Sequence, residues 1–208
     1  ITELTDAMVL SIELAALSTL VSTALGTLIA MALVRYEFFG RRPSNFLIVI
    51  PMATPEVVIG AALLSMFLLY GVSPGFNTIF IAHVMFQISF VAMTVRARVR
   101  GFDWTLEQAA QDLGASPMRT FWKVTFPLIL PGVLAAALLS FALSIDDFII
   151  TLFNSGSVST FPLFINASFK NSFSPQINVL ATIVLVVSVL LMASGTIAGF
   201  VRGRTRKA

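Results

Sequence analysis

Four acidic residues lie within or at the ends of long apolar stretches: Glu13, Glu56, Asp146 and Asp147. An aspartate at the centre of a membrane helix costs about 3 kcal/mol on insertion scales, so such residues usually face a cavity or a partner. Asp146 and Asp147 are adjacent, and on a continuous helix their side chains would point about 100° apart. Only one of them could then face a shared pathway, unless the helix is broken there. Glu13 lies near the end of its stretch, where a solvated helix end explains it.

Carboxylates beside aromatic rings are chemistry suited to a cationic ligand, because ring faces attract cations. Phe148 and Phe153 follow the aspartate pair closely. The alternative is that one aspartate reaches the membrane surface or pairs with a basic residue of a neighbouring subunit, and the residues alone do not decide between these readings. Glu56 follows Pro51 and Pro55, and prolines at membrane depth free backbone carbonyls that commonly line a cavity.

Other catalytic or metal chemistry has little support in the sequence. There is no cysteine, and the single histidine, His83, lies beside Met85 and Phe86. A packed, hydrogen-bonded histidine is favoured there over a proton relay, and no metal site is expected. No glycine-rich phosphate loop is present, so this chain is not expected to bind or hydrolyse ATP itself.

The elements that carry these residues are predicted from composition and hydropathy. Of the 208 residues, 57% are hydrophobic and 11% are charged, and the mean hydropathy is +0.94. A soluble domain carries about 25% charged residues. A membrane helix needs about 20 apolar residues, and five stretches qualify: 7–34, 46–69, 76–95, 128–153 and 177–201. The prediction is an all-α membrane protein with five transmembrane helices in a single transmembrane domain, residues 1–208.

The distribution of basic residues predicts the orientation of these spans. All but Lys170 of the 13 lysines and arginines lie in the segments after the first and third spans or in the C-terminal tail. The positive-inside rule assigns those segments, and the C-terminus, to the cytoplasm. An odd number of spans then leaves the N-terminus outside. A sixth span upstream of Ile1 is expected in the full protein, since it would bring both ends inside.

Residues 101–127, in the cytoplasmic segment after the third span, are predicted to form two short helices joined by a tight turn. Thr105 and Gln108 have the spacing of a capping box at the start of the first helix. Gly114 is suited to end that helix in the left-handed conformation. Ser116 and Pro117 then provide an N-cap and a first helical residue for the second.

The first of these helices has an apolar stripe at i, i+3, i+4 and i+7 spacing: Leu106, Ala109, Ala110 and Leu113. Patterning alone favours a hairpin that rests on lipid headgroups or on its own bundle, because surface helices commonly carry such stripes. The small residues at the centre of the stripe would equally allow another protein surface to approach closely.

The loop is similar to the EAA loop of binding-protein-dependent ABC importer permeases. The family pattern is matched by Ala109, Ala110 and Gly114, and by a Val-x-Phe-Pro ending at Pro127. Gln108 stands at the usual glutamate position, with Glu107 directly before it. In that family the loop is a coupling helix that docks on the ATPase, so the resemblance assigns coupling to Glu107, Gln108, Ala109, Ala110, Gly114 and Ser116. Docking is expected to depend on shape more than on charge.

A closer resemblance covers nearly all of the chain. The run from Leu143 to Gly156 and the stretch 160–182 look like the second permease subunit of spermidine/putrescine-type importers, with the paired aspartates and a Pro-x-Ile-Asn-x-Leu-Ala-Thr segment. Ser172 and Gln176 depart from the usual glycine and glutamate. The resemblance implies a substrate pathway for a small cationic solute, and its residues are predicted to be Asp146, Asp147, Glu56 and Phe148.

The family also implies partners and a mechanism. The partners would be an ATPase dimer that binds ATP-Mg, a second homologous permease subunit, an extracytoplasmic substrate-binding protein and the lipid of a bacterial cytoplasmic (inner) membrane, with no nucleic acid. The chain would form half of a pathway for polyamines that works by alternating access. The alternatives are a permease for another small solute, or a self-contained channel or secondary transporter using the aspartates. An intramembrane enzyme is disfavoured because no nucleophile–base pair is present.

Overall fold

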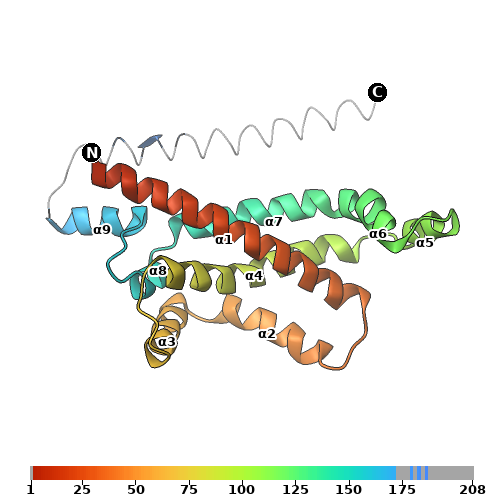
Figure 1. Ribbon diagram of the computed structural model, residues 1–208, viewed down its shortest axis with the longest axis horizontal. Coiled ribbons are helices and arrows are strands. Elements are labelled where there is room, and N and C mark those ends of the chain that lie inside the picture. Colours follow the sequence, from red (N-terminus) through yellow and green to blue (C-terminus); the bar gives the residue numbers. More distant parts are fainter. Residues whose placement is uncertain (1, 172–178, 180–181, 184–185, 187–208) are drawn as a thin grey trace. The chain divides into compact units, whose positions relative to one another are not determined.

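The computed structural model describes residues 2–171 and the separate residues 179, 182, 183 and 186, and every regular element within them is helical. In chain order (Figure 1) the elements are α1 (Thr2–Arg35), α2 (Arg41–Ala53), α3 (Glu56–Leu69), α4 (Phe76–Arg100), α5 (Thr105–Asp112), α6 (Pro117–Thr120), the π-helical turn η1 (Phe121–Thr125), α7 (Phe126–Asp146), α8 (Ile149–Asn154) and α9 (Phe161–Asn171). The chain divides into two compact units, Ile1–Phe164 and Ile165–Ala208. Helices α1 to α8 all belong to the first.

Within the described residues, three helical stretches are long and apolar enough to cross a bilayer: Thr2–Arg35, Phe76–Arg100 and Pro117–Asp146. They correspond to the predicted spans 7–34, 76–95 and most of 128–153. The prediction that 128–153 is one continuous helix is wrong at its far end, because α7 stops at Asp146 and α8 begins at Ile149. The predicted span 177–201 lies outside the described residues.

The predicted span 46–69 is also not one straight helix. Helices α2 and α3 together are apolar enough for one span, but they meet at a bend of 108°. A residue before proline is pushed out of the helical region, and Thr54, before Pro55, is extended with φ −88° and ψ 133°. The Thr54 hydroxyl donates to the Ile50 carbonyl at 2.7 Å, which satisfies one acceptor freed by the break. Helix α3 then starts at Glu56.

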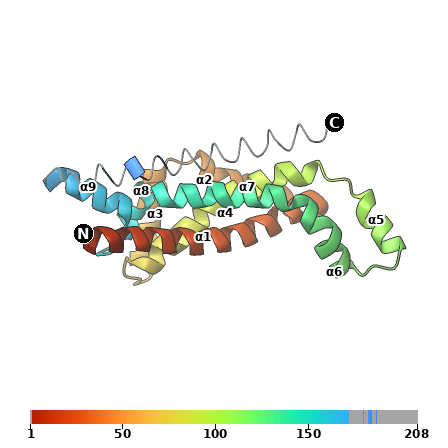
Figure 2. The same ribbon diagram turned by 90° about the horizontal axis from the view of Figure 1, so that it is seen from above.

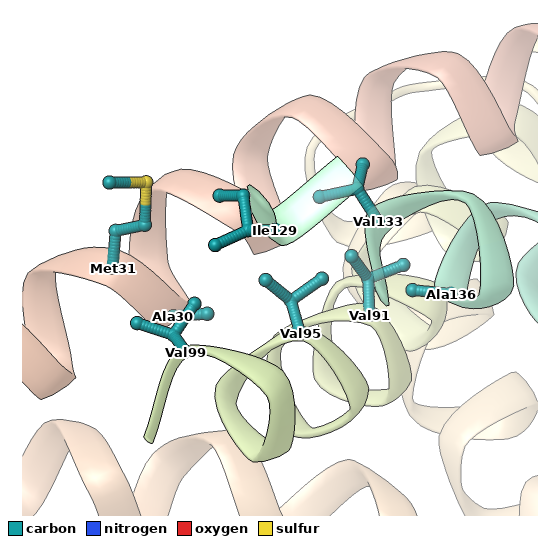
Figure 3. Close-up of a cluster of buried hydrophobic side chains, with 8 residues drawn as sticks. All are labelled: Ala30, Met31, Val91, Val95, Val99, Ile129, Val133 and Ala136. Carbon is teal, nitrogen blue, oxygen red and sulfur yellow. The ribbon is translucent and has the colours of Figure 1, made fainter. Parts of the chain in front are cut away.

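Helices α1, α4 and α7 pack against one another and form the core of the first unit (Figures 1 and 2). Their contact is a cluster of buried aliphatic side chains, drawn in Figure 3: Ala30, Met31, Val91, Val95, Val99, Ile129, Val133 and Ala136. Gly26 of α1 lies so close to α4 that a Cβ there would be 2.6 Å from a methyl carbon of Val91. Small residues that allow such close approach are typical of helix contacts in membranes.

Candidate functional site

The adjacent aspartates lie at a break between two helices. Asp146 is the last residue of α7, and Asp147 has an extended backbone, with φ −64° and ψ 120°. The chain becomes helical again at Ile149. The two side chains are therefore not constrained by one continuous helix, and their surroundings differ: Asp147 is 8% exposed, whereas Asp146 is exposed.

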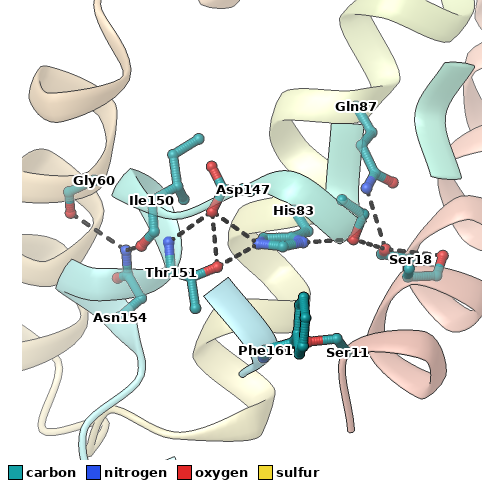
Figure 4. A network of polar contacts seen from close by, with 12 residues as sticks. Ser11, Ser18, Gly60, His83, Gln87, Asp147, Ile150, Thr151, Asn154 and Phe161 are labelled. Atoms are coloured by element: carbon teal, nitrogen blue, oxygen red, sulfur yellow. Dashed lines mark hydrogen bonds and ion pairs between the residues drawn. The ribbon is translucent and has the colours of Figure 1, made fainter. Parts of the chain in front are cut away.

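Asp147 is held by α8 and by α4. Its Oδ2 accepts hydrogen bonds from the backbone N–H of Thr151 at 2.8 Å and from the Thr151 hydroxyl at 2.7 Å. The same oxygen lies 3.3 Å from Nε2 of His83 (Figure 4). A carboxylate that accepts the free N–H groups at a helix start is favoured by the helix dipole. Asp147 therefore caps α8 and ties its first turn to α4.

His83 is the basic partner of Asp147, a pairing that the sequence pattern did not indicate. The ring is 1% exposed. Its Nδ1 lies 2.7 Å from the Ser144 hydroxyl and its Nε2 lies 2.9 Å from the Thr151 hydroxyl. The prediction of a packed, hydrogen-bonded histidine is confirmed. The signal for a polar face was present: His83 and Gln87 are four residues apart and lie on one side of α4.

The polar contacts continue from His83 into the three-helix core. Ser144 lies 3.2 Å from the hydroxyl of Ser18 on α1, and the Gln87 amide donates to that hydroxyl at 3.2 Å. Ser22 donates to the Gln87 carbonyl oxygen at 2.9 Å and lies 3.0 Å from the hydroxyl of Ser140. Hydrogen bonds between helices stabilise membrane bundles, so this series fixes the end of α7 against α1 and α4.

Glu56 and Asp146 are the exposed carboxylates of the site. Glu56 is the first residue of α3, and it lies within electrostatic range of Asp146 and Asp147. Helix α3 packs on α8, where the Asn154 amide donates to the carbonyl of Gly60 at 3.4 Å (Figure 4). Three predicted pathway carboxylates thus gather where two interrupted helices meet. The fourth predicted residue, Phe148, is half-buried between α7 and α8.

The residues predicted to couple to an ATPase lie at the other end of α7, on α5 and in the turn that follows it. Gln108 and Ala109 are exposed, Ala110 is half-buried and Glu107 is buried. Gly114 has φ +85°, and Ser116 is an N-cap whose Oγ accepts from the Arg119 N–H at 3.4 Å. The predicted glycine stop and serine restart are confirmed.

The predicted capping box of Thr105 and Gln108 is wrong. Thr105 is the first residue of α5 rather than its cap. Its N–H and hydroxyl both donate to Oδ1 of Asp103, at 3.0 and 2.8 Å. These hydrogen bonds, the hydroxyl's above all, hold the pKa of Asp103 below its usual value. The helix start is therefore capped by an aspartate two residues upstream of Thr105.

Several large apolar side chains are exposed around these helices: Leu106, Leu113, Met118 and Trp122. They lie on α5, its C-terminal end, α6 and η1. No group of three or more histidine, aspartate or glutamate side chains in the part of the chain that the structure describes could hold a metal ion. The candidate site therefore consists of an exposed apolar surface at one end of α7 and a group of three carboxylates at the other.

The chain matches the family model described as "Binding-protein-dependent transport system inner membrane component" over residues 22–207. It belongs to that family, and is a transport component of the membrane rather than an enzyme. The chain is 38% identical to the spermidine/putrescine transport system permease protein PotC of Haemophilus influenzae, over 91% of this chain and 74% of that protein. It is 35% identical to the putrescine transport system permease protein PotI of Escherichia coli, over 97% of this chain and 74% of that protein.

A solved structure supports the fold. The chain is similar to a chain of the MetNI methionine ABC transporter in inward-facing conformations, with a TM-score of 0.75. The match covers 92% of both chains at 15% identity, so it concerns the fold alone. The family, the homologous permeases and this fold agree with the resemblance found in the sequence.

Proposed function

We propose that this chain is a permease subunit of an ATP-driven importer and forms half of a translocation pathway for polyamines such as spermidine and putrescine. The single observation that carries the proposal is the pairing of two features on one helix. An exposed apolar surface precedes α7, and a group of carboxylates lies at its far end. Similarity to PotC and PotI supports the solute class.

The carboxylates would serve as the cation-binding part of the pathway. Glu56 and Asp146 are exposed, while Asp147 is occupied by His83 and Thr151. A polyammonium solute would gain charge-assisted hydrogen bonds from the two exposed carboxylates. Phe148, beside them, would offer a ring face. The proposed division is that Asp146 and Glu56 contact the solute and Asp147 holds the helix break in shape.

The coupling loop would dock on a separate ATPase through α5. Gln108 and Ala109 are exposed on that helix, and Leu106 and Leu113 extend the apolar surface. Because Gln108 carries no charge, the contact would depend on shape. ATP-Mg would be bound by that ATPase, and closure of an ATPase dimer would push on α5 and open the pathway to the outside.

The proposed assembly contains a second homologous permease subunit and an extracytoplasmic substrate-binding protein, in a bacterial inner membrane. We assign the basic segments and the C-terminal tail to the cytoplasm on the positive-inside rule. The proposed five-span topology takes α2 and α3 as one broken span and keeps the predicted span 177–201, which lies outside the described residues, as the last. Broken helices at membrane depth are tolerated where they line a cavity or are buried in protein.

The test is uptake by proteoliposomes that contain the complete transporter. Labelled spermidine should enter only when the ATPase, ATP and binding protein are all present, and a neutral amino acid should not. Uptake without the ATPase would support a self-contained channel or secondary transporter instead. ATP-dependent uptake of the neutral solute but not of spermidine would keep the importer and overturn the polyamine assignment.

A further inference from the structure

Glu107 is the one α5 residue that turns fully away from solvent. It is 4% exposed, whereas its neighbours Leu106 and Gln108 are exposed. Its Oε2 lies 2.7 Å from Nη2 of Arg35, and Nη1 of Arg35 donates to its Oε1 at 3.2 Å. The hydroxyl of Thr125 also donates to that Oε1. One carboxylate thus joins three elements: the end of α1, α5 and the last residue of η1.

Arg35 is held in place from several sides. It is the last residue of α1, where the helix dipole favours a cation. Its guanidinium lies over the ring of Trp104 at 5.3 Å, a contact that adds to the ion pair. Trp104 makes an edge-to-face contact with Phe102 at 4.7 Å, and both rings pack on the aliphatic core. The cation is therefore fixed to the transmembrane bundle.

A second arginine–glutamate pair, Arg41–Glu37, is a solvent-exposed ion pair and provides a comparison. Arg41 and Glu37 are 3.5 Å apart, and the Glu37 side chain is 93% exposed. Such pairs contribute little because water screens them. The Arg35–Glu107 pair is different, since the Glu107 side chain is only 6% exposed. Removing one partner of a buried pair leaves an uncompensated charge.

We propose that Glu107 is a positioning residue that links α5 to the bundle from its inner side, so that a displacement of α5 moves α1 and α7 together. The role rests on the proposed importer function. It differs from docking, because Glu107 faces the bundle and not the exposed surface. Thr125 ends the π-helical turn that leads into α7, and π-helical turns inside helices are frequent at functional sites.

The test uses the complete transporter in proteoliposomes and measures solute molecules imported per ATP hydrolysed. Glu107→Ala and Arg35→Ala should each lower this ratio about tenfold, while the ATPase still co-purifies with the permease. The double variant should be no worse than either single one, because both changes remove the same contact. The matched control is Glu37→Ala, which removes the exposed pair and should keep the wild-type ratio.

Three results would overturn the proposal: a wild-type ratio in either single variant, a double variant whose loss is the product of the two single losses, or an equal loss in Glu37→Ala. If the Glu107→Ala transporter does not assemble, Glu107→Gln is used instead, because it keeps the shape of the side chain. Its import ratio should lie between those of the wild type and the Arg35→Ala variant. An unchanged ratio would count against the link. Absence of ATP-dependent uptake in the wild type would instead overturn the importer function itself, and is measured first.

Discussion

Each end of α7 has a buried carboxylate with a basic partner, but the two partners differ. At the loop end, which follows α5 and α6, buried Glu107 accepts a hydrogen bond from Thr125 and pairs with Arg35. At the far end, buried Asp147 accepts hydrogen bonds from Thr151 and lies against His83. In each case a buried carboxylate joins a threonine hydroxyl and a basic side chain from another helix.

The difference between the two ends is the basic partner and its surroundings. Arg35 contributes a planar guanidinium with several N–H donors, and its side chain is 32% exposed. His83 is fully enclosed, and both of its ring nitrogens are within hydrogen-bond distance of hydroxyl groups. The loop end is therefore an ion pair at the edge of the bundle, and the far end is a hydrogen-bonded network within it. Each buried carboxylate is followed or preceded by an exposed polar residue: Gln108 follows Glu107, and Asp146 precedes Asp147. We infer that the buried residue of each pair holds the helices together and that the exposed residue contacts a partner or solute.

The largest expected effect comes from Asp147→Ala. This change leaves Thr151 and His83 without their acceptor in a buried site, and breaking a buried pair costs about 3–5 kcal/mol. The thermal midpoint of the purified permease complex in detergent should fall clearly. Asp146→Ala is the matched control, and its midpoint should stay near that of the wild type because Asp146 is exposed. An equal fall of the thermal midpoint in both variants would show that Asp146 and Asp147 do not differ in their structural roles.

Asp146→Asn, unlike Asp147→Ala, should weaken solute uptake and leave stability almost unchanged. Loss of one charge-assisted contact to the solute costs about 1.5–3 kcal/mol, so the spermidine concentration for half-maximal uptake should rise about tenfold or more with little change in stability. Putrescine and spermidine uptake, measured beside the thermal midpoint, separate the two effects. Unchanged uptake of both solutes would exclude Asp146 from the pathway.

Gly26→Val tests the packing of α1, the helix that carries Arg35 at one end and reaches the His83 network through Ser18. A Cβ at position 26 would lie 2.6 Å from Val91, and overpacking of this kind costs about 1–3 kcal/mol. The thermal midpoint should fall, whereas Ala24→Val, at an exposed position two residues away, should leave it unchanged. A neutral Gly26→Val would show that α1 and α4 do not pack this closely.

The smallest effect is expected from Gln108→Glu, which restores the residue usual at this position of the loop. An exposed charge contributes at most about 1 kcal/mol, which corresponds to about fivefold in affinity. Binding of the ATPase to the permease, measured by titration in detergent, should therefore change by less than this factor. A larger change would mean that docking depends on charge rather than shape.

The sequence predicted those features that depend on residues close together in the chain. Gly114 and Ser116 could be assigned from sequence because a positive φ and an N-cap depend on neighbours a few residues away. The helix break at Pro55 was harder to predict, since Pro131 sits inside α7 without ending it. The pairs Arg35–Glu107 and His83–Asp147 join residues far apart in the sequence, and only the packing of α1, α4 and α7 brings them together.

The most direct test of the account asks whether ATP at one end of α7 changes access at the other. The chain has no cysteine, so a single Asp146→Cys variant can be labelled with a membrane-impermeant thiol reagent in the assembled transporter. We predict that labelling from the extracytoplasmic side rises when ATP is bound, and that this rise is lost when Glu107→Ala is added. Labelling that is the same with and without ATP would contradict the account.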